Sequence, residues 1–497
     1  MHFLLQNRQK HGIIKINNEI SSKYYKGDRN IMSENKAGKE LSEKLFLKRK
    51  KLYDDFTEED IAAARDYAEG YMCFLDASKT EREAVRYGIE MAEAEGYREF
   101  RFGESLAVGG KYYYNNRGKA LYIFEIGERA LEEGIHILAA HIDSPRLDLK
   151  QNPLYEQNDI AYLKTHYYGG VKKYQWTTIP LALHGAVTKA DGTTIDITIG
   201  EDESEPVFYI SDLLPHLAKD QVSRPLGEAI PGESLNLFAG CTPLNLEGAE
   251  EKIKLNALNI LNEKYGITEA DFLSAELSAV PAARARYVGL DRGLIGGYGH
   301  DDRVCAYTEM TGFFSVKKHE RTTMVILADK EETGSDGVTG MQSQAFTDLI
   351  DEICDQIGAN RAAVRAASRC LSADVSAAFD PHFAEVYESR NSAYLNRGVV
   401  LNKYTGARGK SGTSDASAEF VGWVRKCFDE AGVVWQTAEL GKVDQGGGGT
   451  VAAYIARKNI DTVDVGVPVL SMHAPWEGIA VGDLYMTHLA FSAFSKA

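Results

Sequence analysis

The sequence has no closely spaced cysteines and no long hydrophobic run. Its six cysteines are far apart, without a C-x-x-C motif, so we expect free, buried thiols rather than disulfides or a thiolate zinc site. No apolar stretch approaches the ~20 residues that cross a bilayer. A membrane-spanning helix is therefore not expected, and any metal must be bound by histidine and carboxylate side chains.

The chain also lacks an excess of basic residues. Its formal net charge is -16 at pH 7, and such a charge repels nucleic-acid phosphates and anionic lipid surfaces. We therefore expect neither a nucleic-acid partner nor a membrane partner. The N-terminus has no signal-peptide pattern of a basic start followed by an apolar stretch, so we expect a cytoplasmic protein.

Length and local patterns predict several structural units, because 497 residues exceed one ordinary hydrophobic core. Residues 1–31 contain scattered polar residues without sustained periodicity, and we expect a disordered tail there. The alternative is an upstream extension of the reading frame, since Met32 opens a sequence typical of a natural start. Residues 32–152 and 291–497 contain short apolar runs that end in polar turns, as in α/β proteins. Residues 153–290 contain alternating patterns and a hairpin turn. This middle segment is predicted to be a β-rich insertion into an α/β domain.

The strongest functional signal is T-M-V-I-L-A-D-K-E-E-T-G-S-D-G, residues 323–337. A β-branched apolar run that ends in a charged turn predicts a buried strand reaching the edge of a sheet. Successive side chains of an extended segment point to opposite sides, so Glu331 and Glu332 can have different tasks, one binding a metal and the other facing a water. A lone Glu-Glu pair is more often a solvated loop. The interpretation therefore depends on further site residues.

Two other segments have the same design. G-I-H-I-L-A-A-H-I-D-S-P places His141 and Asp143 one residue apart at the end of a strand, where the carboxylate can orient the imidazole. G-H-D-D places Asp301 and Asp302 at a predicted helix start. Helix capping is an equal alternative to metal binding for these two aspartates.

Two later segments and a glycine run complete the candidates. R-C-L-S-A-D places Asp374 among small and apolar residues, where a carboxylate needs a cationic partner. T-V-D-V-G-V-P-V-L-S-M-H predicts another buried strand with His473 at its end. The run D-Q-G-G-G-G-T lacks the G-K-[ST] ending of a phosphate loop. We interpret Gly447 and Gly448 as backbone that approaches a substrate closely, with a flexible loop as the alternative.

These strand and turn ends predict one metal-binding cleft, since ligands of open α/β sheets bind beyond the carboxyl ends of the strands. Carboxylates with two imidazoles and no thiolates suit Zn²⁺, with Mn²⁺ or Co²⁺ as replacements. Two ions ~3.5 to 4 Å apart, sharing a bridging Asp and a bridging water, can hold both a nucleophile and a reacting carbonyl.

Together, H-I-D-S-P, G-H-D-D, D-K-E-E-T-G-S, S-A-D-V-S-A-A and S-M-H-A resemble segments of the aspartyl aminopeptidase and vacuolar aminopeptidase I family of dizinc metallo-aminopeptidases, especially its bacterial branch. The resemblance runs from about residue 45 to the C-terminus. It implies an α/β fold, with a phosphorylase/hydrolase-like three-layer catalytic domain and an inserted β-rich assembly domain. It also implies a large homo-oligomer, a tetrahedral dodecamer.

The resemblance further implies two Zn²⁺ per subunit with a defined ligand set. The five implied ligands are His141, Asp301, Glu332, Asp374 and His473. The two histidines would bind different ions and Asp301 would bridge them. The other two carboxylates would each complete the ligand shell of one ion.

The resemblance also implies that Glu331 is the general base and that Asp143 is the partner of His141. Two positions depart from the family pattern. The family commonly has Leu-Asp-Asn where this chain has H-D-D, which makes Asp302 a rival for the bridge. Many members have His where this chain has Ala377.

The predicted activity is hydrolysis of the N-terminal residue from a peptide. One alternative is a related dizinc hydrolase acting on N-acyl amino acids or C-terminal peptide bonds. Another is a non-catalytic assembly protein, although structural zinc sites are usually closed and often Cys-rich. Within the insertion, His216 is predicted to help complete a neighbouring subunit's site, with simple packing as an equal alternative. The preferred N-terminal side chain has no readable signal.

Overall fold

The computed structural model describes residues 38–497. The predicted tail, residues 1–31, lies outside this range. The chain divides into a short N-terminal unit that ends at Lys50, in which residues 38–45 are helical, and a large unit from Lys51 to Ala497. Within residues 38–497, no helix combines the length and apolar character that crossing a membrane requires.

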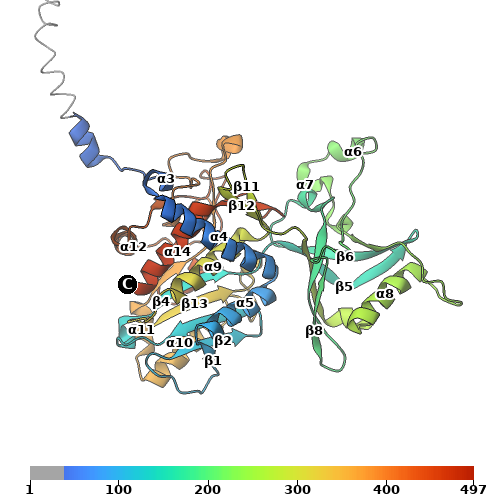
Figure 1. Cartoon of the computed structure of the whole chain (residues 1–497), viewed down its shortest axis with the longest axis horizontal. Helices are drawn as coiled ribbons and strands as arrows, with labels where there is room; N and C mark the ends of the chain where they lie inside the picture. Colours follow the sequence, from blue (N-terminus) through green and yellow to red (C-terminus); the bar gives the residue numbers. More distant parts are fainter. Residues whose placement is uncertain (1–37) are drawn as a thin grey trace, which may run out of the picture. The chain divides into compact units, whose positions relative to one another are not determined.

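A nine-stranded sheet organises the large unit (Figure 1). Its central strands β13, β4, β14 and β18 are parallel, and β3 and β16 flank them in antiparallel orientation. Because both faces of the centre are covered, these strands are almost entirely buried. In sheet order the strands are β1 (Arg98–Glu99), β2 (Lys111–Asn116), β3 (Ala120–Glu125), β13 (Thr323–Ala328), β4 (His136–His141), β14 (Arg369–Ser372), β18 (Asp461–Gly466), β16 (Val399–Asn402) and β17 (Trp435–Thr437).

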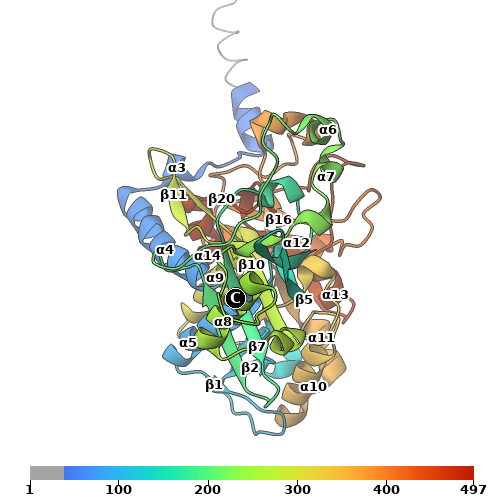
Figure 2. The same cartoon turned by 90° about the vertical axis from the view of Figure 1, so that its right-hand side faces the viewer.

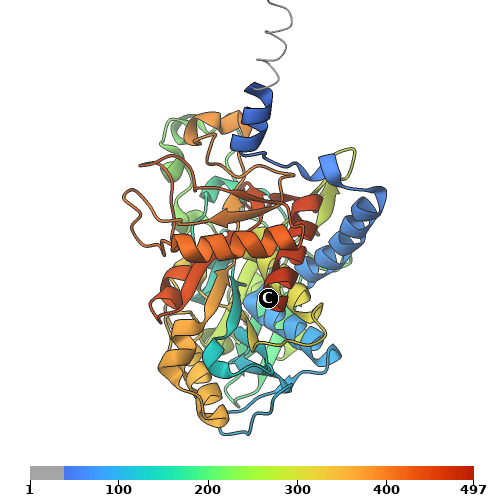
Figure 3. The same cartoon turned by 90° about the vertical axis from the view of Figure 1, so that its left-hand side faces the viewer.

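Helices cover both faces of this sheet, so the part of the large unit around it has three layers (Figures 1 and 3). Along β4, Leu138 and Ala140 belong to one hydrophobic cluster and Ile137 and Ala139 to another, as the pleat of a strand requires. The first cluster includes helices α4 (Glu58–Ala77), α5 (Glu81–Ala94), α9 (His300–Phe314), α12 (Ala418–Glu430) and α14 (Val481–Lys496); the second includes α10 (Ala345–Ile357), α11 (Arg361–Ala367) and α13 (Ala452–Ala456). The predicted α/β class is confirmed.

A second, antiparallel sheet of six strands forms the β-rich part of the chain, with α8 (Lys252–Tyr265) packed against β5, β6 and β9 (Figure 2). In sheet order its strands are β8 (Thr194–Ile199), β7 (Leu181–Thr188), β10 (Ala275–Pro281), β5 (Arg146–Gln157), β6 (Ile160–Tyr168) and β9 (Leu237–Gly240). The sheet begins at Arg146, before the predicted boundary at residue 153. Strand β5 continues past Pro153 because its pairing with β6 shifts register between Leu149 and Leu154. The segment 153–290 as a separate domain stays a prediction.

A third sheet of five short strands supplies two loops of the site. In order these strands are β11 (Arg286–Val288), β12 (Leu294–Gly297), β20 (Glu477–Ala480), β19 (Pro468–Leu470) and β15 (Ser376–Ala377). The segment predicted as one strand ending at His473 is in fact two strands, β18 and β19. His473 lies in the turn that connects β19 to β20, with a positive φ of 66°. The prediction of a single strand was therefore wrong.

All six cysteines lie in the described chain and all are free. Cys305, Cys354 and Cys370 are buried and Cys427 is half-buried, whereas Cys73 and Cys241 are exposed. The expectation of free thiols is confirmed, but the expectation of burial fails for the two exposed residues. None of the six belongs to the groups of potential metal ligands found in the described part of the chain.

Candidate metal centre and active site

Two histidines present the same ring nitrogen to one carboxylate. His141 ends β4, and His473 reaches the same point from the third sheet. Nε2 of His141 lies 3.2 Å from Oδ1 of Asp301, and Nε2 of His473 lies 3.2 Å from Oδ2 of the same residue. The residue predicted to bridge two ions therefore lies between the two histidines, with one oxygen facing each.

A backbone carbonyl holds the other nitrogen of each ring. Nδ1 of His141 is 3.0 Å from the backbone oxygen of Asp143, and Nδ1 of His473 is 3.0 Å from that of Gly170. A carbonyl oxygen can only accept, so Nδ1 carries the proton in both rings. In the neutral imidazole, Nε2 is then left as the lone-pair nitrogen that binds a metal.

The two glutamates follow β13 in a tight turn. The strand ends at Ala328, Lys330 has a positive φ of 68°, and Glu331–Thr333 form the short 3-10 helix η5. The predicted extended geometry at Glu331 and Glu332 was therefore wrong. The turn still directs the two carboxylates to different histidines.

Glu331 lies nearer one histidine and Glu332 nearer the other. Oε2 of Glu331 is 4.0 Å from Nε2 of His141, whereas Oε2 of Glu332 is 3.6 Å from Nε2 of His473. Asp143 holds the turn that carries both, because its Oδ1 accepts the backbone N–H of Glu331 at 3.1 Å and its Oδ2 accepts that of Glu332 at 3.2 Å.

Asp374 comes from the turn after β14, next to the first histidine. In the described chain, two groups of three potential ligands have their donor atoms within 4.8 Å of one another: His141, Asp301 and Glu332 form one, and His141, Asp302 and Asp374 form the other. Asp302 is fully buried, so it is not the solvent-facing helix cap that is the usual alternative. The peptide bond between Asp301 and Asp302 is cis.

Burial makes Glu331 a weak acid. It raises the pKa of the carboxyl to about 7; His141 opposes this rise, and the charges of Asp143 and Asp301 add to it. A carboxyl with a pKa near neutral pH can both accept and release a proton under ordinary conditions, which is the property of a general acid–base catalyst.

The remaining carboxylates create a site that fits a cation. Burial raises the pKa of Glu332 and of Asp374 as well. In Asp301, burial acts in the same direction, but the hydrogen bonds with His141 and His473 outweigh it and lower the pKa. Buried carboxylates in such number are costly without positive charge. Together with two imidazoles and no thiolate, this donor set fits zinc.

A cleft of about 500 Å³ opens onto these side chains. Its lining includes Asp301, Glu331, Glu332, Asp374 and His473. Gly447 and Gly448 also line it, and the backbone at Gly447 has a positive φ of 106°. A Cβ at Gly447 would lie 2.4 Å from the backbone oxygen of Gly406, so only glycine fits there. Substrate binding by this loop stays a prediction.

His216 does not join the others. It is exposed in the loop before α6 (Lys219–Val222), and it is not among the residues that line the cleft of its own chain. Its contribution to a neighbouring subunit's site stays a prediction.

The sequence interpretation missed Glu477. This residue is buried at the start of β20, and its Oε1 accepts the backbone N–H of His473 at 2.7 Å while its Oε2 accepts that of Asp301 at 3.1 Å. Burial raises its pKa to about 8. A carboxylate four residues after His473, in an otherwise apolar stretch, was the available signal.

Comparison with known proteins agrees with this geometry. The family model described as aminopeptidase I zinc metalloprotease (M18) matches residues 74–495. A relative from Clostridium acetobutylicum, named "Probable M18 family aminopeptidase 1", is 49% identical over 460 residues, which cover 90% of this chain and 98% of the relative.

Solved structures extend the comparison. The M18 aminopeptidase from Thermotoga maritima superimposes with a TM-score of 0.87 at 43% identity, covering 91% of this chain and 100% of that one. The mApe1 dodecamer of S. cerevisiae shares the fold, with a TM-score of 0.71 at 18% identity, covering 86% of this chain and 96% of that one.

Proposed function

Because the chain belongs to the aminopeptidase I (M18) family of zinc metalloproteases, we propose that its cleft removes N-terminal residues from peptides with two zinc ions bound per subunit. The chain is a zinc aminopeptidase by this membership; the number of ions and the role of each residue are proposed. The main support is the carboxylate of Asp301, whose two oxygens each face the Nε2 of a different histidine at 3.2 Å.

The division of the ligands between the two ions follows the family resemblance. One ion would be bound by His141, Asp374 and one oxygen of Asp301. The other would be bound by His473, Glu332 and the second oxygen of Asp301, in line with the 3.6 Å between Glu332 Oε2 and His473 Nε2. Mn²⁺ or Co²⁺ could replace zinc with the same donor set.

When bound, the zinc ions act as a Lewis acid that polarises the scissile carbonyl, and they lower the pKa of the attacking water to ~7. Glu331 takes a proton from that water and delivers it to the leaving amine. Asp143 keeps Glu331 in position by accepting its backbone N–H. Gly447 and Gly448 let the substrate approach the backbone of the cleft wall, because no side chain intervenes.

A substrate panel tests the activity. The zinc-loaded protein is expected to hydrolyse peptides with a free N-terminal amine and to leave N-blocked peptides and N-acyl amino acids intact, since the free amine is the group that the site must anchor. Product release is measured by chromatography. Cleavage of N-acyl amino acids would instead indicate the related class of hydrolase, and no cleavage with zinc fully bound would indicate an assembly protein.

Self-assembly through the insertion is the second part of the proposal. The segment 207–226 exposes a group of apolar side chains, each at least half exposed: Val207, Leu213, Leu214, Leu217, Val222 and Leu226. Clustered apolar exposure of this kind marks a protein interface. We infer that the partner is another copy of this chain in a large homo-oligomer, a tetrahedral dodecamer as the family resemblance implies.

His216 lies within this exposed segment, which motivates a test of its role. Replacing His216 by Phe is expected to lower kcat by roughly 10² to 10³-fold, the effect of losing one hydrogen-bond donor to a developing oxyanion. Oligomer size by light scattering and zinc content should stay unchanged. A His216→Phe variant with wild-type kcat would remove the residue from the site.

Leu217→Asp tests assembly separately from His216, because it puts a charge on the exposed apolar segment and leaves the His216 side chain in place. It is expected to shrink the oligomer and to lower activity per chain. A dissociated subunit with full turnover would mean that one chain holds a complete active site and that the insertion serves only as a scaffold.

A further inference from the structure

The end of strand β6, in the insertion, and the residues that follow it contact groups at both proposed metal-binding histidines. Tyr168 is the last residue of this strand, Gly169 and Gly170 follow it, and Gly170 lines the cleft. The first contacts the carboxylate next to His141, and the third contacts His473 directly. The segment therefore continues from a strand of the six-stranded sheet and not from the sheet whose strands end at the cleft.

Tyr168 acts on the first histidine through Asp143. Its hydroxyl donates to Oδ2 of Asp143 at 2.7 Å, and burial raises the pKa of this hydroxyl, so it remains a donor. Oδ1 of Asp143 is 3.4 Å from Nδ1 of His141. The same carboxylate accepts the backbone N–H groups of Glu331 and Glu332. The Tyr168 hydroxyl therefore fixes the rotation of the Asp143 carboxylate. That carboxylate in turn orients two proposed ligands, His141 and Glu332, and the proposed base, Glu331.

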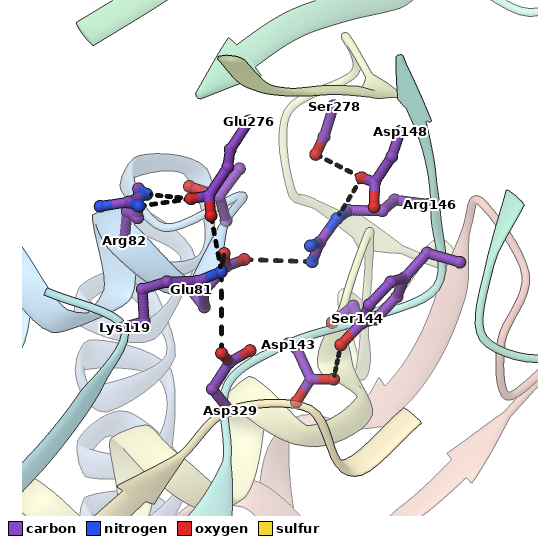
Figure 4. Close-up of polar contacts among 12 residues, drawn as sticks. Glu81, Arg82, Lys119, Asp143, Ser144, Arg146, Asp148, Glu276, Ser278 and Asp329 are labelled. Atoms are coloured by element: carbon purple, nitrogen blue, oxygen red, sulfur yellow. Dashed lines mark hydrogen bonds and ion pairs between the residues drawn. The ribbon is translucent and has the colours of Figure 1, made fainter. Parts of the chain in front are cut away.

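Buried charges hold the Tyr168 ring in place. The guanidinium of Arg146 lies 4.1 Å from the ring centroid. Arg146 is itself held by Glu81 of α5 at 3.1 Å and by Asp148 of β5 at 2.8 Å (Figure 4). Lys119 lies 3.3 Å from Glu81 and 3.8 Å from Asp329 (Figure 4). These contacts join the insertion to α5 and to the end of β13, so the ring has little freedom to move.

The two glycines bring the backbone against the second histidine. The backbone oxygen of Gly170 accepts from Nδ1 of His473 at 3.0 Å. A Cβ at Gly170 would lie 3.1 Å from that nitrogen. A Cβ at Gly169, where φ is +71°, would lie 3.1 Å from Oε2 of Glu332. Even a methyl group at either position would push a proposed ligand by a few tenths of an ångström.

We propose that residues 168–170 of the insertion are positioning residues for both histidines of their own chain, so that zinc affinity depends on the insertion in every subunit, independently of assembly. This inference rests on the proposed dizinc site. Groups that hold the outer nitrogen of a ligating histidine, or that orient its partner, typically change metal affinity by about 10- to 100-fold.

Tyr168→Phe is the first test, because it keeps the ring under Arg146 and removes only the hydroxyl. The zinc-loaded protein is titrated with a competing chelator, and zinc release is followed by absorbance. The equivalent of zinc bound by His141 is expected to dissociate with a Kd raised about 10- to 100-fold, because the His141 ring itself contacts Asp143, whereas Glu332 contacts it only through its backbone N–H. Tyr167→Phe is the matched control, since the neighbouring ring is 42% exposed; its zinc affinity should equal that of the wild type.

Gly170→Ala is the second test and acts on the other histidine. It should weaken one equivalent of zinc by about tenfold, and the Tyr168→Phe/Gly170→Ala double variant should weaken both equivalents. The absorption spectrum of the Co²⁺-loaded protein should change in each variant, because the ligand geometry changes. A purely structural role would instead lower the thermal stability of the chelated protein and leave zinc affinity and the Co²⁺ spectrum unaltered.

His141→Ala separates failure of this inference from failure of the proposed site. If His141→Ala loses zinc while Tyr168→Phe and Gly170→Ala keep wild-type affinity, the insertion does not position the histidines and the inference is wrong. If His141→Ala itself retains two zinc ions, the proposed ligand set is wrong. If Tyr168→Phe and Gly170→Ala weaken the same equivalent of zinc, the assignment of Tyr168 to His141 and of Gly170 to His473 is overturned.

Discussion

Replacing Glu331 by Gln is expected to lower peptide hydrolysis by roughly 10² to 10⁴-fold while the zinc content stays at the wild-type value. The amide has the size of the carboxylate but cannot take a proton from the attacking water. The backbone N–H of Glu331 remains bound to Asp143, so the turn is preserved. The two measurements are kcat with a free-amine peptide and zinc per chain by elemental analysis.

Glu332→Gln is the matched control for this prediction. The two residues are neighbours in the same turn and differ in proposed role, so Glu332→Gln should lose zinc together with activity. If Glu331→Gln also released an ion, Glu331 would be reassigned as a ligand. Full activity of Glu331→Gln would exclude it as the base.

Replacing Asp301 by Ala should have the largest effect on metal binding, with both ions weakened and activity lost. The reason is geometric, because its two oxygens face two different histidines at 3.2 Å each. The backbone groups of Asp301 keep their partners, since its N–H donates to Glu477 and its carbonyl accepts from Ser144. Local structure should therefore survive, and zinc stoichiometry with calorimetric affinities measures the effect.

Asp302→Ala provides the comparison, because the side chain is adjacent and equally buried. Of the two groups of potential metal ligands, Asp302 belongs to the one with His141 and Asp374 and not to the one with Glu332. Its removal is expected to affect no more than one ion. Should Asp302→Ala release both ions and Asp301→Ala only one, the bridge would be Asp302 and the residue assignment would shift by one position.

Local sequence patterns were sufficient to locate most of the site. The β-branched run before Glu331 and the apolar run before His141 correspond to β13 and β4, whose carboxyl ends do meet at one sheet edge. Each pattern is contained within about ten residues, and the strand period and the polar turn both have sequence signatures. Family membership confirms the fold class and the activity, whereas the individual ligand roles stay predictions.

Local patterns failed where the backbone depends on distant partners. The turn at Glu331–Thr333 is stabilised by the carboxylate of Asp143, which is 188 residues away from Glu331. The turn at His473 depends on Glu477 and is joined by the third sheet to β12. A left-handed residue such as Lys330 has no strong sequence signal, because only the surrounding contacts make that conformation favourable.

The sequence by itself determined the chemistry available to this protein: buried strands that end in carboxylates and imidazoles, with no thiolate pair to compete for a metal. Only the tertiary structure decided which groups hold those side chains in place. Gly170 and His473 are 303 residues apart, and Asp301 and Glu477 are 176 apart. Such contacts use backbone N–H and C=O groups that every residue type shares, so they leave no pattern in the sequence and arise only when the sheets pack together.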